Sequence, residues 1–300
     1  MVTSAAARWA LLVVLSALAS GPVAAAAAVE TVDDSGHSVR RAQPAQRIVA
    51  LTPHLTELLY AAGAGDAIVG AAAFSDQPPA ARSIPRIGDA RALDLERIVA
   101  LQPDLVVAWV SGSPHRQLAR LRALGLTVFE NEPSDFDAIA STIERLGVLA
   151  GTSAVAQARA AEFRRELARI RASYGDHAPV RVFYQVADRP LVTVSSKHVI
   201  ADALRVCGAV NVFEGARNWL PRPSREAVLL ADPDAIVVAA PVGTDALVAW
   251  KRWTALRAVA AGRLYVVDPD TLHRATPRIL EGVEALCGHI AQTAAGSANR

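Results

Sequence analysis

One pattern of residues occurs twice in this chain, and it constrains the fold more than any other feature of the sequence. Residues 94–108 read DLERIVALQPDLVVA, and residues 224–238 read SREAVLLADPDAIVV. In each copy an N-capping residue and a first-turn glutamate begin a helix, a Pro-Asp turn ends it, and a short apolar strand follows. Residues 55–63 and 200–208 match more weakly, each as a helix that ends at glycine. We therefore predict two related lobes.

Short apolar strands and helices alternate around these copies. Strands are predicted at residues 47–51, 67–70, 105–109, 126–129, 180–186 and 264–267. Thr52 is predicted to cap a helix that has Pro53 at its first position and ends at Gly63. This alternation is typical of a parallel sheet with helices on both faces.

Residues 152–174 break the alternation, because they contain no glycine or proline and are rich in Ala, Glu and Arg. A single helix of this length would be roughly 35 Å long. We predict an α/β fold with two Rossmann-like lobes, residues 29–150 and 179–300, joined by one long backbone helix within residues 151–178. A ligand cleft is expected between the lobes, near the carboxyl ends of the strands.

Residues 1–28 have the pattern of a secretory signal peptide. Arg8 is their one charged residue, an apolar run covers residues 10–19, and small residues follow Gly21-Pro22. The alternative is a membrane anchor, but the apolar run is shorter than a span requires. We expect the chain to be exported and this segment to be cleaved.

The composition excludes some classes of protein. The formal net charge is +2 with 20% charged residues, which disfavours a nucleic-acid binder with a basic surface. Cys207 and Cys287 would most simply form one disulfide in an exported chain, and two buried free thiols are the alternative. Closing a loop of about 80 residues would stabilise the fold by roughly 4 kcal/mol.

The sequence shows no catalytic or metal-binding constellation. It contains no Gly-x-Ser-x-Gly elbow, phosphate loop or dinucleotide fingerprint, and its seven histidines lack metal-site spacing. We therefore expect no catalytic residue, no metal site and no resident cofactor. Each histidine is expected to be structural or solvated rather than a ligand contact, and His273 is the main candidate for an exception.

Several loops after predicted strands carry aromatic or charged residues. Phe74, Trp109 and Trp219 would each be either a ligand platform or a cap on the core, and Asp270 and Arg274 follow the strand at residues 264–267. Together they would suit a large ligand with an apolar body and polar edges.

Glu96 and Glu226 occupy the same position in the two copies of the repeat. A carboxylate in the first turn stabilises a helix through the macrodipole. The alternative is that the two glutamates are paired contacts for a partner with two-fold symmetry.

These residues resemble a known family. The chain is similar to the periplasmic binding proteins whose two lobes are joined by a single long helix, which serve ATP-binding-cassette importers of cobalamin, haem and ferric siderophores. The resemblance covers nearly the whole chain after the leader. It rests on RIVALTPHLTELLYAAG, FSDQPP, DLERIVALQPDLVVAW, PSREAVL and residues 270–278. Trp109, the Cys207/Cys287 pair and residues 270–278 are most similar to the cobalamin branch.

The resemblance implies contacts with the ligand. Phe74 would lie against the corrin ring, where the family normally has tyrosine, and Trp109 would line the same cleft. Asp270 and Arg274 would contact the polar rim of the ligand. Trp219 lies beside a position that is aromatic in the cobalamin branch.

The resemblance also implies a disulfide between Cys207 and Cys287 in the second lobe. Glu96 and Glu226 would dock on arginines of the importer's membrane subunits. The expected protein is a monomeric periplasmic carrier of cobalamin or a related corrinoid that catalyses no reaction and binds no nucleic acid.

Two alternatives stay open. One is a haem or ferric-siderophore carrier of the same fold, in which a haem carrier would need His273 or Tyr184 as an iron ligand. An exported enzyme or partner-binding module on the same scaffold is the other alternative, because a fold does not fix function.

Overall fold

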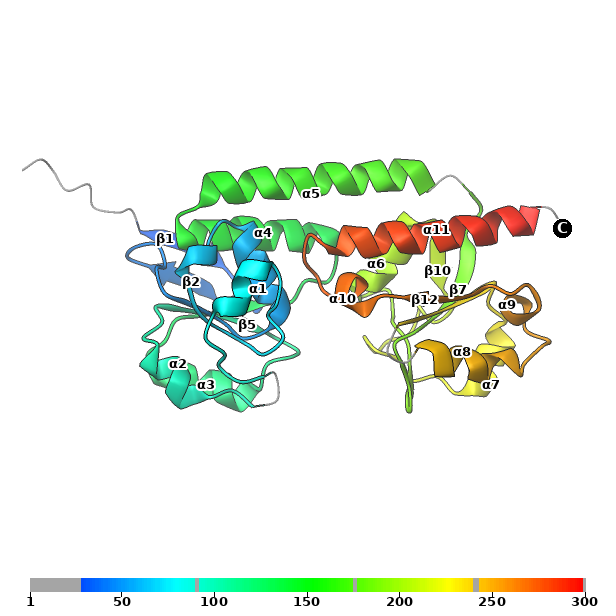
Figure 1. Cartoon of the computed structure of the whole chain (residues 1–300), viewed down its shortest axis with the longest axis horizontal. Helices are drawn as coiled ribbons and strands as arrows, with labels where there is room; N and C mark the ends of the chain where they lie inside the picture. Colours follow the sequence, from blue (N-terminus) through cyan, green and yellow to red (C-terminus); the bar gives the residue numbers. More distant parts are fainter. Residues whose placement is uncertain (1–27, 90–91, 175–176, 240–242, 299–300) are drawn as a thin grey trace, which may run out of the picture.

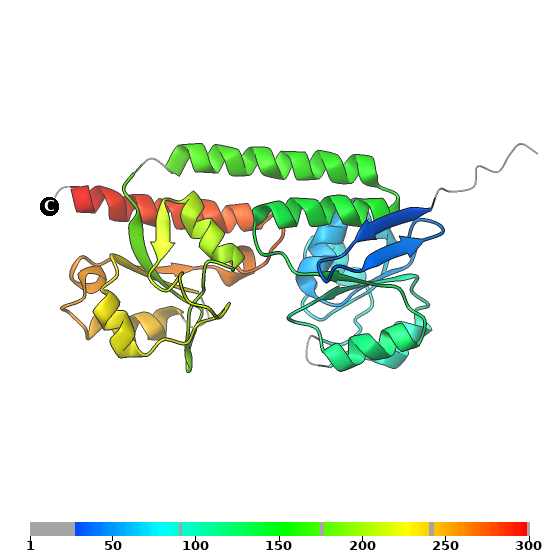
Figure 2. The same ribbon diagram turned by 180° about the vertical axis from the view of Figure 1, so that it is seen from behind.

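Two lobes lie side by side beneath one long helix (Figure 1). The computed structural model describes residues 28–89, 92–174, 177–239 and 243–298, so all but the last residue of the expected leader lies outside the described residues. Helix α5 (Ser153–Tyr174) runs along the top of both lobes. Beneath it lie α4 (Phe136–Ala150) and α11 (Ile279–Ala298), one on each lobe, as the view from behind also shows (Figure 2).

Each lobe is built on a four-stranded parallel sheet. The N-terminal sheet contains β3 (Ile48–Ala50), β4 (Ile68–Ala71), β5 (Leu105–Trp109) and β6 (Val128–Asn131), in the order β4-β3-β5-β6. The C-terminal sheet contains β7 (Val180–Gln185), β10 (Ala209–Asn211), β11 (Ala235–Ala239) and β12 (Leu264–Val267), in the order β10-β7-β11-β12. Within each lobe the first strand lies between the second and the third. The two lobes therefore repeat one topology, and the predicted α/β fold with Rossmann-like lobes is confirmed.

Helices connect the strands of each sheet. They are α1 (Pro53–Ala61), α2 (Leu95–Ala100) and α3 (His115–Ala123) in the N-terminal lobe, and α6 (Val199–Val206), α7 (Arg225–Ala231), α8 (Gly243–Lys251), α9 (Arg257–Ala260) and α10 (Pro269–Leu272) in the C-terminal lobe. Two hairpins, β1 (Val29–Val32) with β2 (Ser38–Arg41) and β8 (Ala187–Asp188) with β9 (Leu191–Val192), and two short 3₁₀ helices, η1 (Gly65–Ala67) and η2 (Pro79–Ser83), complete the described part. In that part we find no helix with the length and apolar character needed to span a membrane.

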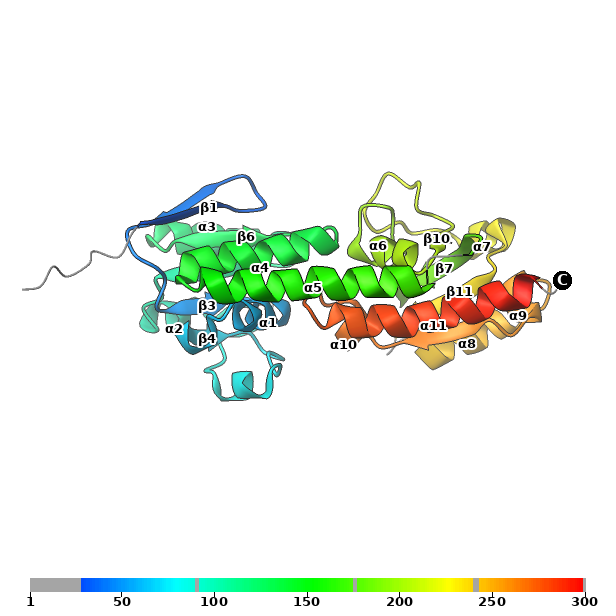
Figure 3. The ribbon, with the colours of Figure 1, turned by 90° about the horizontal axis from the view of Figure 1, so that it is seen from above.

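Alternate residues of each strand enter different cores. Ile48 and Ala50 pack with α1 and α4, whereas Val49 packs with α2 and α3 on the other face of the sheet. The core beside α4 continues under α5 to α11 and into the C-terminal lobe. This shared apolar layer holds the lobes together, and Figure 3 shows α5 crossing from one lobe to the other above it.

The Pro-Asp turn has the same structural role in both lobes. The Asp104 carboxylate accepts the Arg47 backbone N–H at 3.1 Å, and the Arg47 side chain donates to the carbonyl at the C-terminal end of α2 at 2.6 Å. The Asp234 carboxylate accepts the Arg181 backbone N–H at 3.0 Å, and the Arg181 side chain donates to the last carbonyl of α7 at 2.8 Å. Each turn thus ties the end of a helix to the start of the first strand, which explains why the pattern occurs twice.

The start of α1 differs in one contact from the prediction. Thr52 is the N-cap residue, but its side chain accepts no hydrogen bond from the first turn. Its hydroxyl instead lies 3.1 Å from Nδ1 of His54. The predicted N-cap position is confirmed, and the partner of the Thr52 hydroxyl is an imidazole rather than a backbone N–H of the first turn. The end of the helix is as expected, with Gly63 at φ +78°.

The long helix is anchored by close packing at its start. Gly151 ends α4 with φ +73°, and α5 begins two residues later. A Cβ atom at Gly147 would lie 2.2 Å from the Cβ of Ala156, so α4 and α5 can touch only because residue 147 is glycine. The 22 residues of α5 give a rod of about 33 Å.

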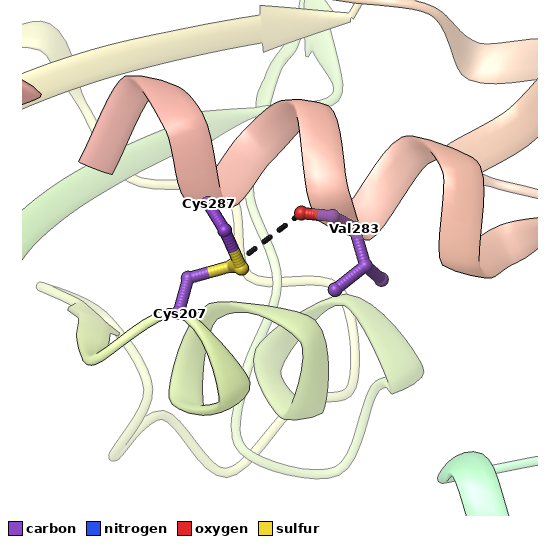
Figure 4. Close-up of a disulfide and its surroundings, with 3 residues drawn as sticks. All are labelled: Cys207, Val283 and Cys287. Carbon is purple, nitrogen blue, oxygen red and sulfur yellow. Dashed lines mark hydrogen bonds between the residues drawn. A yellow bond between two sulfur atoms is a disulfide. The ribbon is translucent and has the colours of Figure 1, made fainter. Parts of the chain in front are cut away.

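Cys207 and Cys287 form a disulfide that joins α6 to α11 (Figure 4). Cys207 is the C-cap residue of α6, and both cysteines are fully buried. The alternative of two free thiols is therefore wrong.

We expect the double variant Cys207→Ala/Cys287→Ala to fold with a free energy of unfolding lower by about 2–5 kcal/mol, because the 80-residue loop is no longer closed in the unfolded chain. Urea denaturation at pH 7 measures the difference. The wild-type protein with a reductant should match the variant. Equal stability of the oxidised protein and the variant would contradict this account.

Candidate ligand-binding cleft

A cavity of about 320 Å³ opens between the two lobes. The N-terminal lobe lines it with Pro53, His54, Trp109, Glu132 and Pro133, and the C-terminal lobe with Val186, His198, Val199, Ile200, Trp219, Leu220, His273, Arg274 and Ala275. Residues directly after β6 and β7 and the last residue of β5 are among them, so the cavity lies at the carboxyl ends of strands from both sheets. That is the edge at which open α/β sheets bind ligands.

A larger cavity, of about 730 Å³, lies elsewhere in the C-terminal lobe. Its lining includes Pro179 and Val180 at the start of β7 and the ion-paired Asp234 and Arg257. Pro179, Val180 and Asp234 lie at the amino ends of β7 and β11, and Arg257 begins α9. We therefore take the interlobe cavity as the candidate site.

Trp109 forms one wall of the cleft and is fixed on several sides. Its indole Nε1–H donates to Oε1 of Glu132 at 3.0 Å, and its ring meets the edge of the His54 ring with centroids 5.3 Å apart. Its backbone N–H donates to Oγ of Ser113 at 3.0 Å. Gly112 leaves the space that the ring needs, because a Cβ there would lie 1.8 Å from it. The indole is therefore held in place before any ligand arrives.

In the C-terminal lobe, Trp219 and His198 line the cavity across from Trp109. The two rings are stacked, with centroids 4.8 Å apart and planes at 27°. The Trp219 indole N–H donates to the Lys197 carbonyl at 3.2 Å. His198 is the N-cap of α6, and its Nδ1 accepts the Ile200 backbone N–H at 3.1 Å. Both rings thus have directional contacts to the backbone.

Arg274 belongs to an ionic cluster around the buried Glu57 carboxylate between the lobes. Its Nη1 lies 3.2 Å from Oε1 of Glu57, and its Nη2 lies 3.0 Å from Oδ1 of Asp270. Glu57 comes from α1 in the other lobe and also accepts a hydrogen bond from Thr276 at 3.0 Å. Arg278 lies 3.5 Å from the same carboxylate. The guanidinium that faces the cleft is therefore already paired with two carboxylates.

The imidazoles of the cleft are uncharged at neutral pH. Burial lowers the pKa of His54, His198 and His273 to about 4 in each case. The charge of Arg274 lowers the pKa of His54 further, and the Asn131 amide partly opposes both effects. Nε2 of His273 lies 2.9 Å from the hydroxyl of Tyr184, a fully buried phenol whose pKa burial raises.

Four of the six predicted ligand-binding residues line this cavity: Trp109, Trp219, His273 and Arg274. Asp270 is exposed and reaches the site through its ion pair with Arg274. Phe74 does not line the cavity, and its predicted contact with a ligand stays a prediction.

The Phe74 loop has an unusual backbone. Phe74 has φ +65° and is 72% exposed, a conformation and exposure that are both uncommon for an aromatic residue. The next residue, Ser75, is fully buried; its hydroxyl accepts from Thr56 at 3.1 Å and its carbonyl accepts from Arg86 at 3.0 Å. The loop thus holds an aromatic side chain outward, from a strained backbone position next to the buried Ser75.

Three residues line the cleft that were not predicted from the sequence: His54, His198 and Glu132. A signal for the two histidines was present, because they lie at the N-termini of α1 and α6, the two helices that the weaker repeat had paired. No local pattern marks Glu132, whose carboxylate becomes a cleft residue by accepting the Trp109 N–H.

Glu96 and Glu226 lie outside the cleft. Each is exposed in the first turn of its helix, α2 or α7, behind the capping side chain of Asp94 or Ser224. Hydrogen bonds from its own backbone N–H and from Ser224 lower the pKa of Glu226. Neither carboxylate forms an ion pair within the described part of the chain. Both helices lie on the side of the molecule opposite α5, at the bottom of Figure 1.

Asp33, His37 and Glu130 are grouped closely enough to hold a cation. The Asp33 carboxylate, however, already accepts the N–H groups of His37 at 2.8 Å and Glu130 at 3.2 Å, and Glu130 is ion-paired with Arg122 at 3.0 Å. These hydrogen bonds and this ion pair account for the close grouping of the three side chains, without a metal ion.

Residues 48–271 match the family model described as periplasmic binding protein. The chain is 36% identical over 248 residues to the vitamin B12-binding protein of Vibrio cholerae, with 82% of this chain and 90% of that protein covered. It is 33% identical over 252 residues to the vitamin B12-binding protein of Vibrio vulnificus, with 84% and 92% covered.

Solved structures of periplasmic binding proteins also match the chain. The crystal structure of the periplasmic vitamin B12 binding protein BtuF of Vibrio cholerae matches with a TM-score of 0.76 and 36% identity, covering 83% of this chain and 98% of that one. A periplasmic heme binding protein from Pseudomonas aeruginosa matches with a TM-score of 0.72 and 27% identity, covering 83% and 94%. The chain described here belongs to the periplasmic binding protein family.

Proposed function

We propose that this protein captures cobalamin or a closely related corrinoid and delivers it to an ATP-binding-cassette importer. It would catalyse no reaction and would work as an exported protein in the periplasm, after removal of the leader. The observation that carries the proposal is the pair of fixed indoles, Trp109 and Trp219, which face one cavity from opposite lobes. Two such walls suit a flat macrocycle with a large apolar face.

The charges of the cleft favour an uncharged ligand. Glu132 and Arg274 are the ionised residues of its lining, and Arg274 is paired with Glu57 and Asp270. The imidazoles are neutral, so the described lining offers no free cation. A corrinoid with neutral amide side chains meets no penalty there, whereas haem propionates or an anionic siderophore would face the Glu132 carboxylate without a counter-ion.

The relatives support the same ligand. Two proteins that the chain matches over most of their length are named for vitamin B12 binding, at 36% and 33% identity. The identity to the heme binding protein is lower, at 27%.

A haem ligand remains the second candidate, because Tyr184 and His273 form a hydrogen-bonded pair at the cleft. An iron ligand from this pair would have to give up the 2.9 Å contact between Nε2 and the hydroxyl. Haem binding would then be visible in the absorption spectrum and lost in His273→Ala.

Glu96 and Glu226 are the proposed contacts with the membrane subunits of the importer. They are exposed, equivalent in the two lobes and free of ion pairs in the described chain. Opposite charges on the importer would steer and orient the loaded protein.

We expect Trp109→Ala and Trp219→Ala each to weaken cyanocobalamin binding about 10- to 100-fold, because each removes one aromatic wall. Phe74→Ala should also weaken binding without loss of stability, since the side chain is exposed. Isothermal titration of the mature protein measures the three affinities. Trp253→Ala, outside the cavity, is the control and should bind like the wild type. Unchanged affinity in both cleft variants would rule out this site.

We expect Glu96→Lys/Glu226→Lys to bind cyanocobalamin normally but to lose complex formation with the importer, because docking is electrostatic. Pull-down with the importer in detergent and uptake into proteoliposomes measure the loss. Glu166→Lys, on α5 at the opposite side of the molecule, should keep both activities. Normal uptake by the double variant would contradict the docking role.

We expect the stability of the ligand-free protein to fall as the pH is lowered from about 6.5 toward 5. The three buried imidazoles have a pKa of about 4 in the folded chain and 6.5 when unfolded, so the unfolded state binds more protons in this window. Above pH 7 this effect is absent. Urea denaturation across the range measures it. His273→Gln should flatten the slope and His115→Gln, at an exposed position of α3, should not; equal slopes would refute the assignment.

A further inference from the structure

Each lobe presents an imidazole packed against an indole to the cleft. His54 packs on Trp109 at the start of α1, and His198 packs on Trp219 at the start of α6. The pairs differ in what the imidazole can offer. Nε2 of His54 is buried and shut off from the cavity beside the Asn131 amide. Nε2 of His198 is not enclosed in this way, and its ring lines the cavity.

The backbone fixes which nitrogen of His198 carries the proton. The Ile200 N–H donates to Nδ1 at 3.1 Å, so Nδ1 must keep its lone pair. In the neutral ring the proton then resides on Nε2. Protonation of Nδ1 would remove the helix cap and would place a positive charge at the N-terminus of α6, where the helix dipole opposes it. The cap therefore holds the imidazole neutral and in one tautomer.

The orientation of this N–H group is also fixed. Trp219 covers one face of the ring and is itself held by its bond to the Lys197 carbonyl. Among the described residues, no side chain or carbonyl accepts a hydrogen bond from Nε2 of His198. A neutral donor without an acceptor thus lies at the wall of the cavity.

We propose that His198 is a specificity-determining residue that donates its Nε2–H to a carbonyl oxygen on the rim of the ligand, and that it does not ligate the metal. The inference rests on the proposed function and refines it. A corrinoid carries peripheral amides, whose carbonyl oxygens are suitable neutral acceptors. A bond from Nε2 to cobalt or iron would need the lone pair there, which would require the proton to move to Nδ1 and break the cap of α6.

The test separates the two roles of His198, namely the helix cap at Nδ1 and the hydrogen-bond donor at Nε2. In His198→Asn the amide oxygen can still cap α6, but no N–H reaches the position of Nε2. We expect normal thermal stability and cyanocobalamin binding weakened about 3- to 10-fold, the effect of one neutral hydrogen bond. His198→Gln can place an N–H near the position of Nε2 and should recover part of the affinity. His115→Asn, exposed at the start of α3, is the matched control.

Two spectroscopic measurements test the tautomer and the excluded metal bond. Long-range ¹H–¹⁵N spectra should show His198 protonated at Nε2 with and without ligand. Aquacobinamide, which leaves an axial position of cobalt available, should bind without a change in its visible spectrum that depends on His198.

The outcomes distinguish failure of this inference from failure of the proposed function. No binding of cyanocobalamin to the wild-type protein would remove the proposed function itself. Wild-type binding with unchanged affinity in His198→Asn, a proton found on Nδ1, or a cobalt spectrum that shifts only when His198 is present would each overturn the inference alone.

Discussion

The arrangement of the lobes depends on the contacts of one carboxylate, that of Glu57. It is almost fully buried on α1 of the N-terminal lobe, and its partners Arg274, Thr276 and Arg278 all come from the C-terminal lobe. A buried carboxylate that loses its partners costs about 3–5 kcal/mol. The lobes therefore cannot separate at this point without a large penalty. The same cluster orients Arg274 at the cleft and holds Asp270 beside it, so one set of bonds fixes both the lobes and a side chain that lines the cavity.

Helix α6 links the cleft to the scaffold. His198 caps its N-terminus inside the cleft, and Cys207 at its C-cap is bonded to α11. Because α11 and α4 both share an apolar core with α5, the position of the His198 ring is determined by the whole layer of long helices. The cleft is thus preorganised by contacts that lie far from it, which lowers the ordering cost of binding.

The sequence was enough to predict what local patterns encode. The repeated Pro-Asp turns, the long helix without glycine or proline and the glycine stops at Gly63 and Gly208 predicted two α/β lobes on one helix, because each signal acts within a few residues of itself. The sequence was not enough to predict the contacts of side chains whose partners lie far away along the chain. Glu57 reads as an ordinary helical carboxylate, and only folding brings Arg274 to it. His198 reads as an isolated histidine, and only the stacked Trp219 and the Ile200 N–H give it a direction. Thr52 is the N-cap as predicted, but the sequence pattern does not show that its hydroxyl pairs with the neighbouring His54 imidazole.

Strand β1 and the end of α11 lie at opposite ends of the long axis of the molecule (Figure 1). Both are remote from the interlobe cavity and from the side that carries α2 and α7. A linker joined at the end of α11 would leave the cleft open to solvent, and α5 and α11 are long enough to keep that linker well away from it. The protein could therefore be fixed to a sensor chip through this end, and the layer so formed would keep the interlobe cavity accessible to the solution.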